Sequence, residues 1–143
     1  MIRGLDTSFI IQLEVGAHAR HRQARALRDR FLDAGDRFAL APQVLAEFVH
    51  IVTDARRFEL PLSAEAAVRR AEAWWNAEEV VPALPNEHTT LRFLSWMREH
   101  RLGRKRLLDT LLAATYHTNE IASVVTSNIR DYAIFGCFEV VGV

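Results

Sequence analysis

The chain has 143 residues, half of them hydrophobic and a quarter charged, which is enough for one folded domain spanning residues 1–143 with its own core. Eighteen Lys and Arg residues balance eighteen Asp and Glu residues, which excludes a chain-wide electrostatic grip on nucleic acid and leaves only a local patch. The single cysteine, Cys137, excludes an internal disulfide and a Cys-based zinc site. No apolar run approaches the length of a membrane span, so we expect a cytoplasmic protein without membrane contact.

The first dozen residues form an apolar stretch that contains one acid, Asp6. A carboxylate in such a setting costs several kcal/mol of desolvation unless donors, a cation or a strand end compensates it. A short buried strand ending at Leu5, followed by a helix beginning at Thr7 and Ser8, would place Asp6 at the carboxyl edge of a parallel sheet, where ligands bind in such folds. The simpler interpretation is that Asp6 only caps the helix.

The remaining elements are expected from apolar spacing and from end signals such as Pro42, Ser63 and Asn86. In chain order they are a helix at 17–34, a strand at 38–41, helices at 43–56 and 64–79, a strand at 80–81, helices at 87–100 and 107–117, a strand at 122–126, a loop or short helix at 127–132 and a strand at 138–143. Helices that alternate with short apolar strands predict a three-layer α/β/α domain with a central parallel sheet of four to five strands.

The same spacing predicts which side chains face the core on three of these helices. They are Val68, Ala71 and Trp75 on the first, Leu91, Leu94 and Met97 on the second, and Leu108, Leu111, Leu112 and Thr115 on the third. Because Trp74 and Trp75 cannot both face one side of a helix, one of them is a candidate for a protein-covered surface. This observation favours self-association.

Three further acids repeat the anomaly of Asp6. Glu47 lies beside the apolar stripe of its helix, where an acid is unusual in a purely structural helix. Asp109 lies in the first turn of a strongly apolar helix, where the helix dipole alone would also favour it. Asp131 follows the strand that ends at Thr126, with Asn128 three residues before it.

If these acids converge, their repulsion must be offset, because like charges in one site raise each other's pKa unless a cation neutralises them. A cluster of Asp, Glu and Asn oxygens without cysteine suits Mg²⁺ or Mn²⁺ rather than zinc or copper. One or two such ions could activate a water for attack on a phosphodiester. The chemistry implied is metal-assisted phosphodiester hydrolysis.

Four segments in order resemble the motifs of PIN-domain ribonucleases, and together they span nearly the whole chain. They are Gly4-Leu5-Asp6-Thr7-Ser8, Pro42-Gln43-Val44-Leu45-Ala46-Glu47-Phe48-Val49, Leu108-Asp109-Thr110-Leu111-Leu112-Ala113-Ala114, and Val125-Thr126-Ser127-Asn128-Ile129-Arg130-Asp131-Tyr132. The length and layout are most similar to the VapC-type toxins of bacterial toxin–antitoxin pairs. The resemblance implies a Mg²⁺- or Mn²⁺-dependent endoribonuclease that is held inactive by a cognate antitoxin and is commonly dimeric.

Carried over by position, Asp6, Glu47 and Asp109 would be catalytic acids that bind the metal. Two residues compete for the fourth position, because many relatives have Asp where Asn128 stands, whereas Asp131 matches the acid of an Asp-Phe pair in which Tyr132 replaces Phe. The resemblance and hydroxyl chemistry also imply donors that orient the carboxylates, and these are Thr7, Ser8 and Thr126.

Two further segments, one basic and one containing two histidines, bear on possible binding roles. Arg104, Lys105 and Arg106 precede the helix of Asp109 and either form an exposed loop or hold RNA phosphates beside the site. His18 and His21 lie three residues apart in the predicted helix 17–34, but no Glu or Cys nearby completes a zinc site. Two rival functions stay open, a non-catalytic PIN-fold module that binds RNA or protein and a related metal-dependent DNA nuclease.

Overall fold

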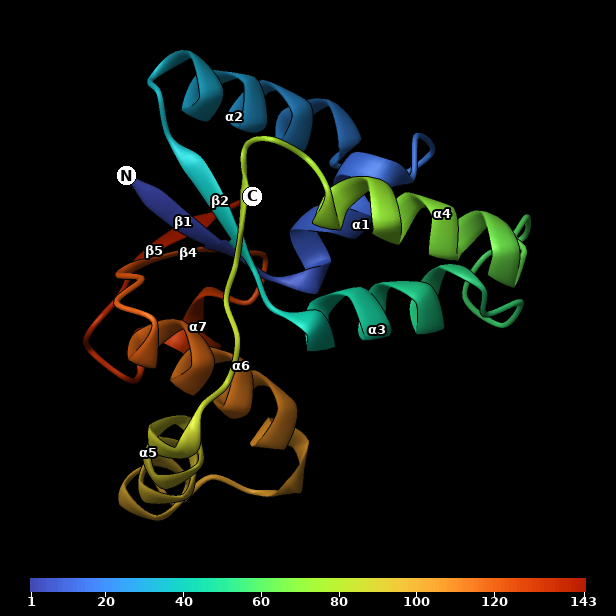
Figure 1. The fold of residues 1–143 in the computed structure, drawn as a ribbon. Coiled ribbons are helices and arrows are strands. Elements are labelled where there is room, and N and C mark those ends of the chain that lie inside the picture. Colours follow the sequence, from blue (N-terminus) through green and yellow to red (C-terminus); the bar gives the residue numbers. More distant parts are fainter.

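The computed structural model describes residues 1–143, which form alternating strands and helices (Figure 1). In chain order the elements are β1 (Ile2–Leu5), α1 (Thr7–Glu14), α2 (His21–Asp33), β2 (Arg37–Leu40), α3 (Pro42–Val52), α4 (Ala64–Trp75), β3 (Val80–Pro82), α5 (Glu87–Glu99), the 3₁₀ helix η1 (Arg104–Arg106), α6 (Leu107–Thr118), β4 (Ser123–Thr126), α7 (Ile129–Ala133) and β5 (Glu139–Gly142). None of the helices has both the length and the hydropathy needed to cross a bilayer.

The five strands form one parallel sheet in the order β3-β2-β1-β4-β5, with β1 at its centre. Helices α1 and α2 cover one face of this sheet, and α5, α6 and α7 lie on the other side (Figure 1). The predicted three-layer α/β/α arrangement with a parallel central sheet is therefore confirmed. Because every strand runs the same way, all five carboxyl ends meet at one edge.

A single cluster of 27 buried apolar residues fills the space between the layers. Tyr116 of α6 lies fully buried against β1, and its hydroxyl donates to the carbonyl oxygens of Leu5 at 2.6 Å and Ala39 at 3.3 Å. Gly4 permits this approach, because a Cβ there would lie 2.7 Å from the Tyr116 ring. The glycine before Leu5 and Asp6 thus fixes the distance between the central strand and helix α6.

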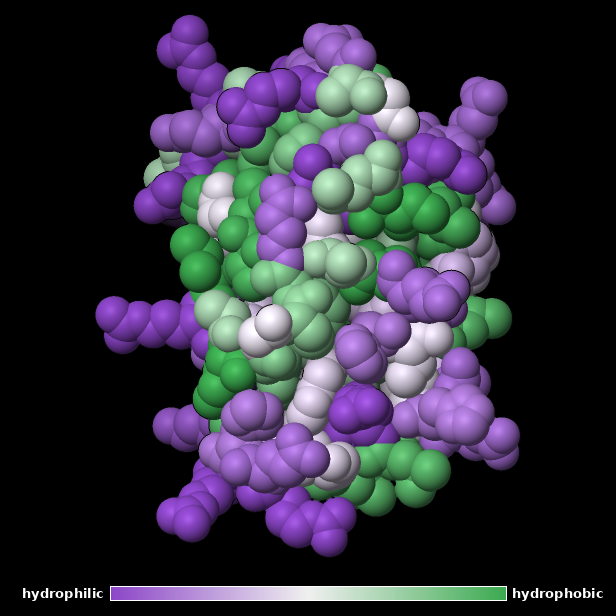
Figure 2. All heavy atoms as spheres, turned by 90° about the vertical axis from the view of Figure 1, so that its left-hand side faces the viewer, coloured by the Kyte–Doolittle hydropathy of each residue, from purple (hydrophilic) through white to green (hydrophobic).

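The opposite edge of the sheet, at the amino ends of the strands, faces the viewer in Figure 2. Apolar patches on this face are separated and surrounded by projecting polar side chains. The residues predicted to form a site lie away from this face, at the carboxyl ends of β1 and β4.

Several expected helix boundaries were wrong, for local reasons. The second helix begins at His21 rather than Ala17, because Val15 to Arg20 form turns in which His18 and His21 each donate a backbone N–H to a carbonyl three residues earlier. Helix α3 ends at Val52 rather than Arg56, since the Thr53 hydroxyl donates to the Val49 carbonyl at 2.7 Å. Helix α4 ends at Trp75, and Ser63 caps its start as predicted.

The predicted inward faces of three helices were also partly wrong. On α4, Ala67 and Ala71 are buried, whereas Val68 is 45 % exposed. On α5 the buried face contains Thr89 and Trp96, which stacks on Phe135 with ring centroids 4.3 Å apart. The side chains that are exposed against expectation are Leu91 and Leu94 on α5 and Leu108 on α6.

Candidate active site

Asp6 lies where β1 ends and α1 begins, and it is both a helix cap and part of a cleft. One carboxylate oxygen accepts the Thr7 N–H at 2.9 Å and the Tyr132 hydroxyl at 3.2 Å. The other accepts the hydroxyls of Ser8 at 2.9 Å and Thr126 at 2.6 Å. Four donors thus compensate the burial of a carboxylate that is only 4 % exposed, so the cap interpretation is correct but incomplete.

The same donors connect the two loops that leave the central strands. Ser8 Oγ accepts the backbone N–H of Ser127 at 3.1 Å, and Thr126 Oγ1 accepts the N–H of Asn128 at 2.9 Å. The loop after β4 is therefore held against the start of α1, with the Asp6 carboxylate between them. Parallel pairing of β1 with β4 is what brings these distant parts of the sequence together.

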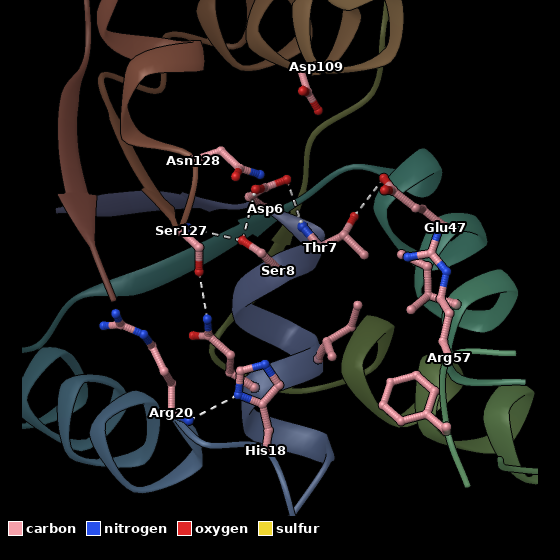
Figure 3. Close-up of a pocket in the computed structure, with 14 residues that line it drawn as sticks. Asp6, Thr7, Ser8, His18, Arg20, Glu47, Arg57, Asp109, Ser127 and Asn128 are labelled. Carbon is pink, nitrogen blue, oxygen red and sulfur yellow. Dashed lines mark hydrogen bonds between the residues drawn. The ribbon is translucent and has the colours of Figure 1, made fainter. Parts of the chain in front are cut away.

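Glu47 projects from α3 towards the same region, and the Thr7 hydroxyl donates to its carboxylate at 3.0 Å (Figure 3). Asp109 projects from the first turn of α6 and faces Asp6 and Asn128 across the cleft. One cavity of about 780 Å³ is lined by side chains that include Asp6, Glu47, Asp109 and Asn128. The structure thus brings together three predicted acids and the predicted amide.

The electrostatics of the cleft show an excess of negative charge. Burial first, and then the charges of Asp6, Asp131 and Glu47, raise the pKa of Asp109 to about 6, while Arg106 partly opposes them. The Tyr132 hydroxyl has its pKa raised well above the ordinary value, first by burial and then by the charges of Asp6 and Asp109. The tyrosine is therefore a neutral donor to Asp6 at physiological pH.

Asp131 occupies a different position from the other acids. It lies in α7, outside the residues that line the cavity, and its carboxylate is 3.5 Å from the Arg106 guanidinium. Arg106 also donates to the Asp131 backbone carbonyl. Asn128, rather than Asp131, contributes a side chain to the cavity wall, although the Asp131 charge still acts on Asp109.

The basic segment before α6 is the 3₁₀ helix η1. Arg104 and Lys105 are exposed, whereas Arg106 is engaged by Asp131. None of the three lines the large cavity. Of these three residues, only Arg104 and Lys105 therefore keep their cationic groups accessible to a ligand.

Sequence reasoning gave several residues of the cavity wall no role in this cleft. They are His18, which was considered only for a zinc site, and Arg20, Arg57 and Phe58. Each comes from a turn or loop, or from the residue just before a helix, where no apolar periodicity marks it. A signal was available only in residue type, since aromatic rings and arginine guanidinium groups are the side chains on which unpaired bases stack.

No three acidic, histidine or cysteine side chains are close enough in this conformation to chelate one ion directly. The donor set nevertheless fits Mg²⁺ or Mn²⁺, because oxygen ligands surround the cavity and their repulsion is visible in the raised pKa of Asp109. Mg²⁺ commonly keeps several water ligands, so it does not require a closed cage of side chains.

Comparison with known protein families decides the classification. Residues 5–133 match the PIN domain family. The chain belongs to this family. The match begins at Leu5, the last residue of β1, and extends to the end of α7, so it includes Asp6, Glu47, Asp109, Asn128 and Asp131.

Individual relatives of this PIN domain are bacterial. The chain is 29 % identical over 131 residues to Ribonuclease VapC31 of Mycobacterium tuberculosis, covering 92 % of this chain and 91 % of the relative. It is 28 % identical over the same length and shares of each chain to Ribonuclease VapC25 of that organism.

Solved structures support the same fold. The M. tuberculosis toxin VapC20, described as cleaving the sarcin–ricin loop, superposes with a TM-score of 0.71 at 19 % identity over 97 % of this chain and 98 % of that chain. A chain of VapBC-1 from nontypeable Haemophilus influenzae gives a TM-score of 0.67 at 22 % identity over 99 % and 98 %. These similarities show that the PIN fold extends over nearly the whole chain.

Proposed function

We propose that this PIN domain is a metal-dependent endoribonuclease and the toxin of a type II toxin–antitoxin pair. The observation that carries the proposal is the convergence of Asp6, Glu47 and Asp109 on one cavity, where burial and the charges of Asp6 and Glu47 raise the pKa of Asp109. The names of the relatives, VapC31 and VapC25 ribonucleases, support RNA as the substrate. Residues 1–143 would act as one unit in the cytoplasm.

The proposed metal ligands are Asp6, Glu47 and Asp109, with Asn128 as a neutral fourth oxygen ligand. Asp131 remains the alternative, but its ion pair with Arg106 would first have to break. When bound, one or two Mg²⁺ or Mn²⁺ ions would supply Lewis-acid activation of a water and neutralise charge on the phosphate. The protein's own side chains hold the metal-binding groups in the orientation that this reaction needs.

The orienting residues are the donors around the acids. The hydroxyls of Ser8 and Thr126 hold one oxygen of Asp6, and the Thr7 N–H and the Tyr132 hydroxyl hold the other. The Thr7 hydroxyl holds Glu47. The carboxylates of Asp6 and Glu47 therefore have donors that limit their rotation, which is how outer groups tune a metal site. Burial and the neighbouring carboxylates raise the pKa of Asp109 to about 6, so without an ion this acid takes up a proton as the pH falls through that value.

The proposal is tested by incubating the purified chain with a labelled single-stranded RNA in Mg²⁺, in EDTA, and in EDTA followed by excess Mn²⁺. We expect cleavage with Mg²⁺, none in EDTA and recovery with Mn²⁺. Glu47→Gln should abolish cleavage, whereas Glu59→Gln, an exposed acid outside the cavity, should leave it unchanged. Cleavage that persists in EDTA or in Glu47→Gln would contradict the proposal.

The same assay separates the two rivals. Preferential cleavage of a DNA strand of the same sequence would favour the DNA nuclease. Binding of RNA without cleavage under any metal condition would favour the non-catalytic module.

We also propose a cognate antitoxin protein as a partner, and self-association of the chain. Two structures of similar fold are VapBC assemblies, VapBC-1 from nontypeable Haemophilus influenzae and VapBC2 from Rickettsia felis bound to a promoter DNA fragment. The exposed leucines Leu91, Leu94 and Leu108 are candidates for covered surface. Trp74 is less suitable than its sequence suggests, because its indole N–H donates to Glu14 at 2.8 Å and the ring is half-buried. Light scattering that shows only monomers at all concentrations would contradict self-association.

A further inference from the structure

The cavity that contains the acids is larger than one or two hydrated ions need, and its lining is chemically mixed. At about 780 Å³ it lies within the size range of pockets for organic ligands. Asp6, Glu47 and Asp109 form an acidic part of the lining, which also includes Arg20, Arg57 and two rings, His18 and Phe58. Figure 3 shows Arg20 on one side of α1 and Arg57 on the other, with the Arg57 guanidinium beside Glu47. Ion binding accounts for the acids but leaves Arg57 and the rings unexplained.

Arg57 and Phe58 are presented by a turn that follows α3. The carbonyl of Asp54 accepts the backbone N–H groups of both residues, at 3.0 and 3.1 Å, and the Leu62 N–H donates to the Val52 carbonyl at 2.9 Å to close the loop. These backbone hydrogen bonds hold the loop against the end of α3 and keep Arg57 and Phe58 beside the cavity.

The Arg57 guanidinium is available for a ligand. Arg56 forms the side-chain hydrogen bonds to Asp54, at 3.2 and 3.5 Å, whereas Arg57 lies 3.6 Å from that carboxylate without a hydrogen bond. The Arg57 side chain is 57 % exposed. It therefore keeps its donors for a planar, bidentate contact of the kind that arginine makes with phosphate.

A second, independent observation comes from Gln12, which is another residue of the cavity wall. Gln12 is only 3 % exposed, and its amide nitrogen donates to Ser127 Oγ at 2.6 Å. Its Oε1 atom is buried and has no hydrogen-bond partner, although Gln12 lines the cavity. An unpaired buried acceptor costs free energy, so a donor from a ligand would be stabilising there. Nucleotides offer such donors in exocyclic amines and the ribose hydroxyl.

We propose that the part of the cavity lined by Arg57 and Phe58 is a subsite for a nucleotide that flanks the scissile phosphate of single-stranded RNA. Arg57 contacts a backbone phosphate, Phe58 stacks on a base, and Gln12 Oε1 accepts a hydrogen bond from the same nucleotide. The subsite rests on the proposed ribonuclease function and extends it to substrate binding. RNA is favoured over an acidic peptide because an aromatic ring lies beside the cations, and base stacking on aromatic rings is a main source of single-strand affinity.

The test is the binding of a fluorescein-labelled RNA oligonucleotide to the full chain, measured by anisotropy in EDTA, where no cleavage is expected. Arg57→Ala should raise the Kd at least about fivefold and reduce the slope of log Kd against log salt by about 0.7, the value for one lost phosphate contact on a single strand. Phe58→Ala should raise the Kd at least about fivefold without changing the slope, and Phe58→Tyr should restore binding.

Two matched controls lie in the same loop. Arg56 also pairs with Asp54 but does not line the cavity, and Leu60 is 90 % exposed and outside it. Arg56→Ala and Leu60→Ala should leave both the Kd and the salt slope unchanged, with thermal unfolding showing that all variants are folded. Equal effects of the cavity variants and their controls would overturn the subsite.

The outcomes also separate the subsite from the proposed function. If the wild-type chain cleaves RNA with Mg²⁺ but Arg57→Ala and Phe58→Ala bind RNA normally, the subsite alone is wrong. If both residues are needed for RNA binding but no metal supports cleavage, the proposed function fails and the subsite stands. Displacement of the RNA by an oligoglutamate of the same charge, as effectively as by unlabelled RNA, would show selection for charge alone and would also overturn the subsite.

Discussion

Strand β1 carries charged clusters at both of its ends, and the two clusters are built in opposite ways. At the amino end, Asp36 accepts Arg3 Nε at 2.7 Å and the amino group of Met1 at 3.0 Å. Arg3 also reaches Ser123 and Glu139 and lies over the Phe31 ring at 4.1 Å. These hydrogen bonds and charges hold the pKa of Asp36 below its ordinary value.

At the carboxyl end, the acids face one another with little cationic compensation. Burial and three neighbouring carboxylates raise the pKa of Asp109, and Arg106, the cation that opposes this, is paired with Asp131. Asp6 is held by neutral donors alone. The amino end is therefore an arrangement that stabilises the fold, whereas the carboxyl end costs stability, and we expect the proposed cation to offset that cost.

The strongest test of this comparison replaces one acid at each end of β1 by the corresponding amide. Asp6→Asn should remain folded, because asparagine is also a good helix cap, but it should lower RNA cleavage by at least about 1,000-fold by removing a metal ligand. Cleavage rates and circular dichroism measured on the same sample would check both expectations. Wild-type activity in this variant would show that Asp6 is only a cap.

At the other end, Asp36→Asn should lower the free energy of unfolding by about 2 kcal/mol, the size of charge-assisted hydrogen bonds lost from a buried group. The activity of the folded fraction should be unchanged. A lowered pKa means that this stabilisation is complete above the unfolded value near 3.8 and is lost as the pH falls through the native pKa. Urea unfolding at pH 7 and below pH 3.8 measures how far the free energy of unfolding of the variant falls below that of the wild type. The same loss at both pH values would contradict the ion pair.

A smaller effect is expected for Tyr132→Phe, which removes one of four donors to Asp6. The hydrogen bond is long, at 3.2 Å, so we expect a loss of about threefold to tenfold in Mn²⁺ affinity, at the weak end of effects from outer groups. Calorimetric titration with Mn²⁺ measures the affinity, and urea unfolding in EDTA serves as the stability control. Unchanged affinity would show that the tyrosine only fills space.

The smallest effect is expected for Asp109→Asn in metal-free buffer. Because the native pKa of about 6 lies above the unfolded value of 3.8, the wild-type chain loses stability as the pH rises between these values. At pH 7.5 the melting temperature of the variant should therefore exceed that of the wild type, by no more than about 2–4 °C because the group is partly exposed. Below pH 4 the two proteins should melt at the same temperature. Added Mn²⁺ should reverse the order at pH 7.5. A variant that melts lower in EDTA at pH 7.5 would contradict the repulsion.

Much of the fold followed from local patterns. Short apolar strands separated by amphipathic helices were enough to predict the parallel sheet, and caps at Ser63 and Asn86 were placed correctly. The inward faces were harder, because α5 buries Trp96 against Phe135 and leaves Leu91 exposed, a choice made by tertiary packing that helical periodicity alone does not reveal.

The candidate site likewise has one part that sequence patterns predicted and another that only the folded structure reveals. The acids were conspicuous because each interrupts an apolar stretch, and parallel strand ends explained why Asp6 and the residues after Thr126 should meet. The arginine and aromatic part of the cavity depends on the turn around Asp54, whose hydrogen bonds set where Arg57 and Phe58 lie. No sequence periodicity encodes that turn. Which residue completes the ligand set, Asn128 or Asp131, also depends on an ion pair that only the folded chain forms.

The central claim is that the acids at the carboxyl end of β1 form one divalent-cation site. It is tested most directly by a crystal structure of the chain with Mn²⁺, using anomalous scattering to locate the ion. The account predicts an anomalous peak within the cavity, coordinated by carboxylate oxygens of Asp6 and Asp109 with water or Glu47 completing the shell. A cavity without Mn²⁺ at saturating concentration, or an ion bound only elsewhere, would contradict it.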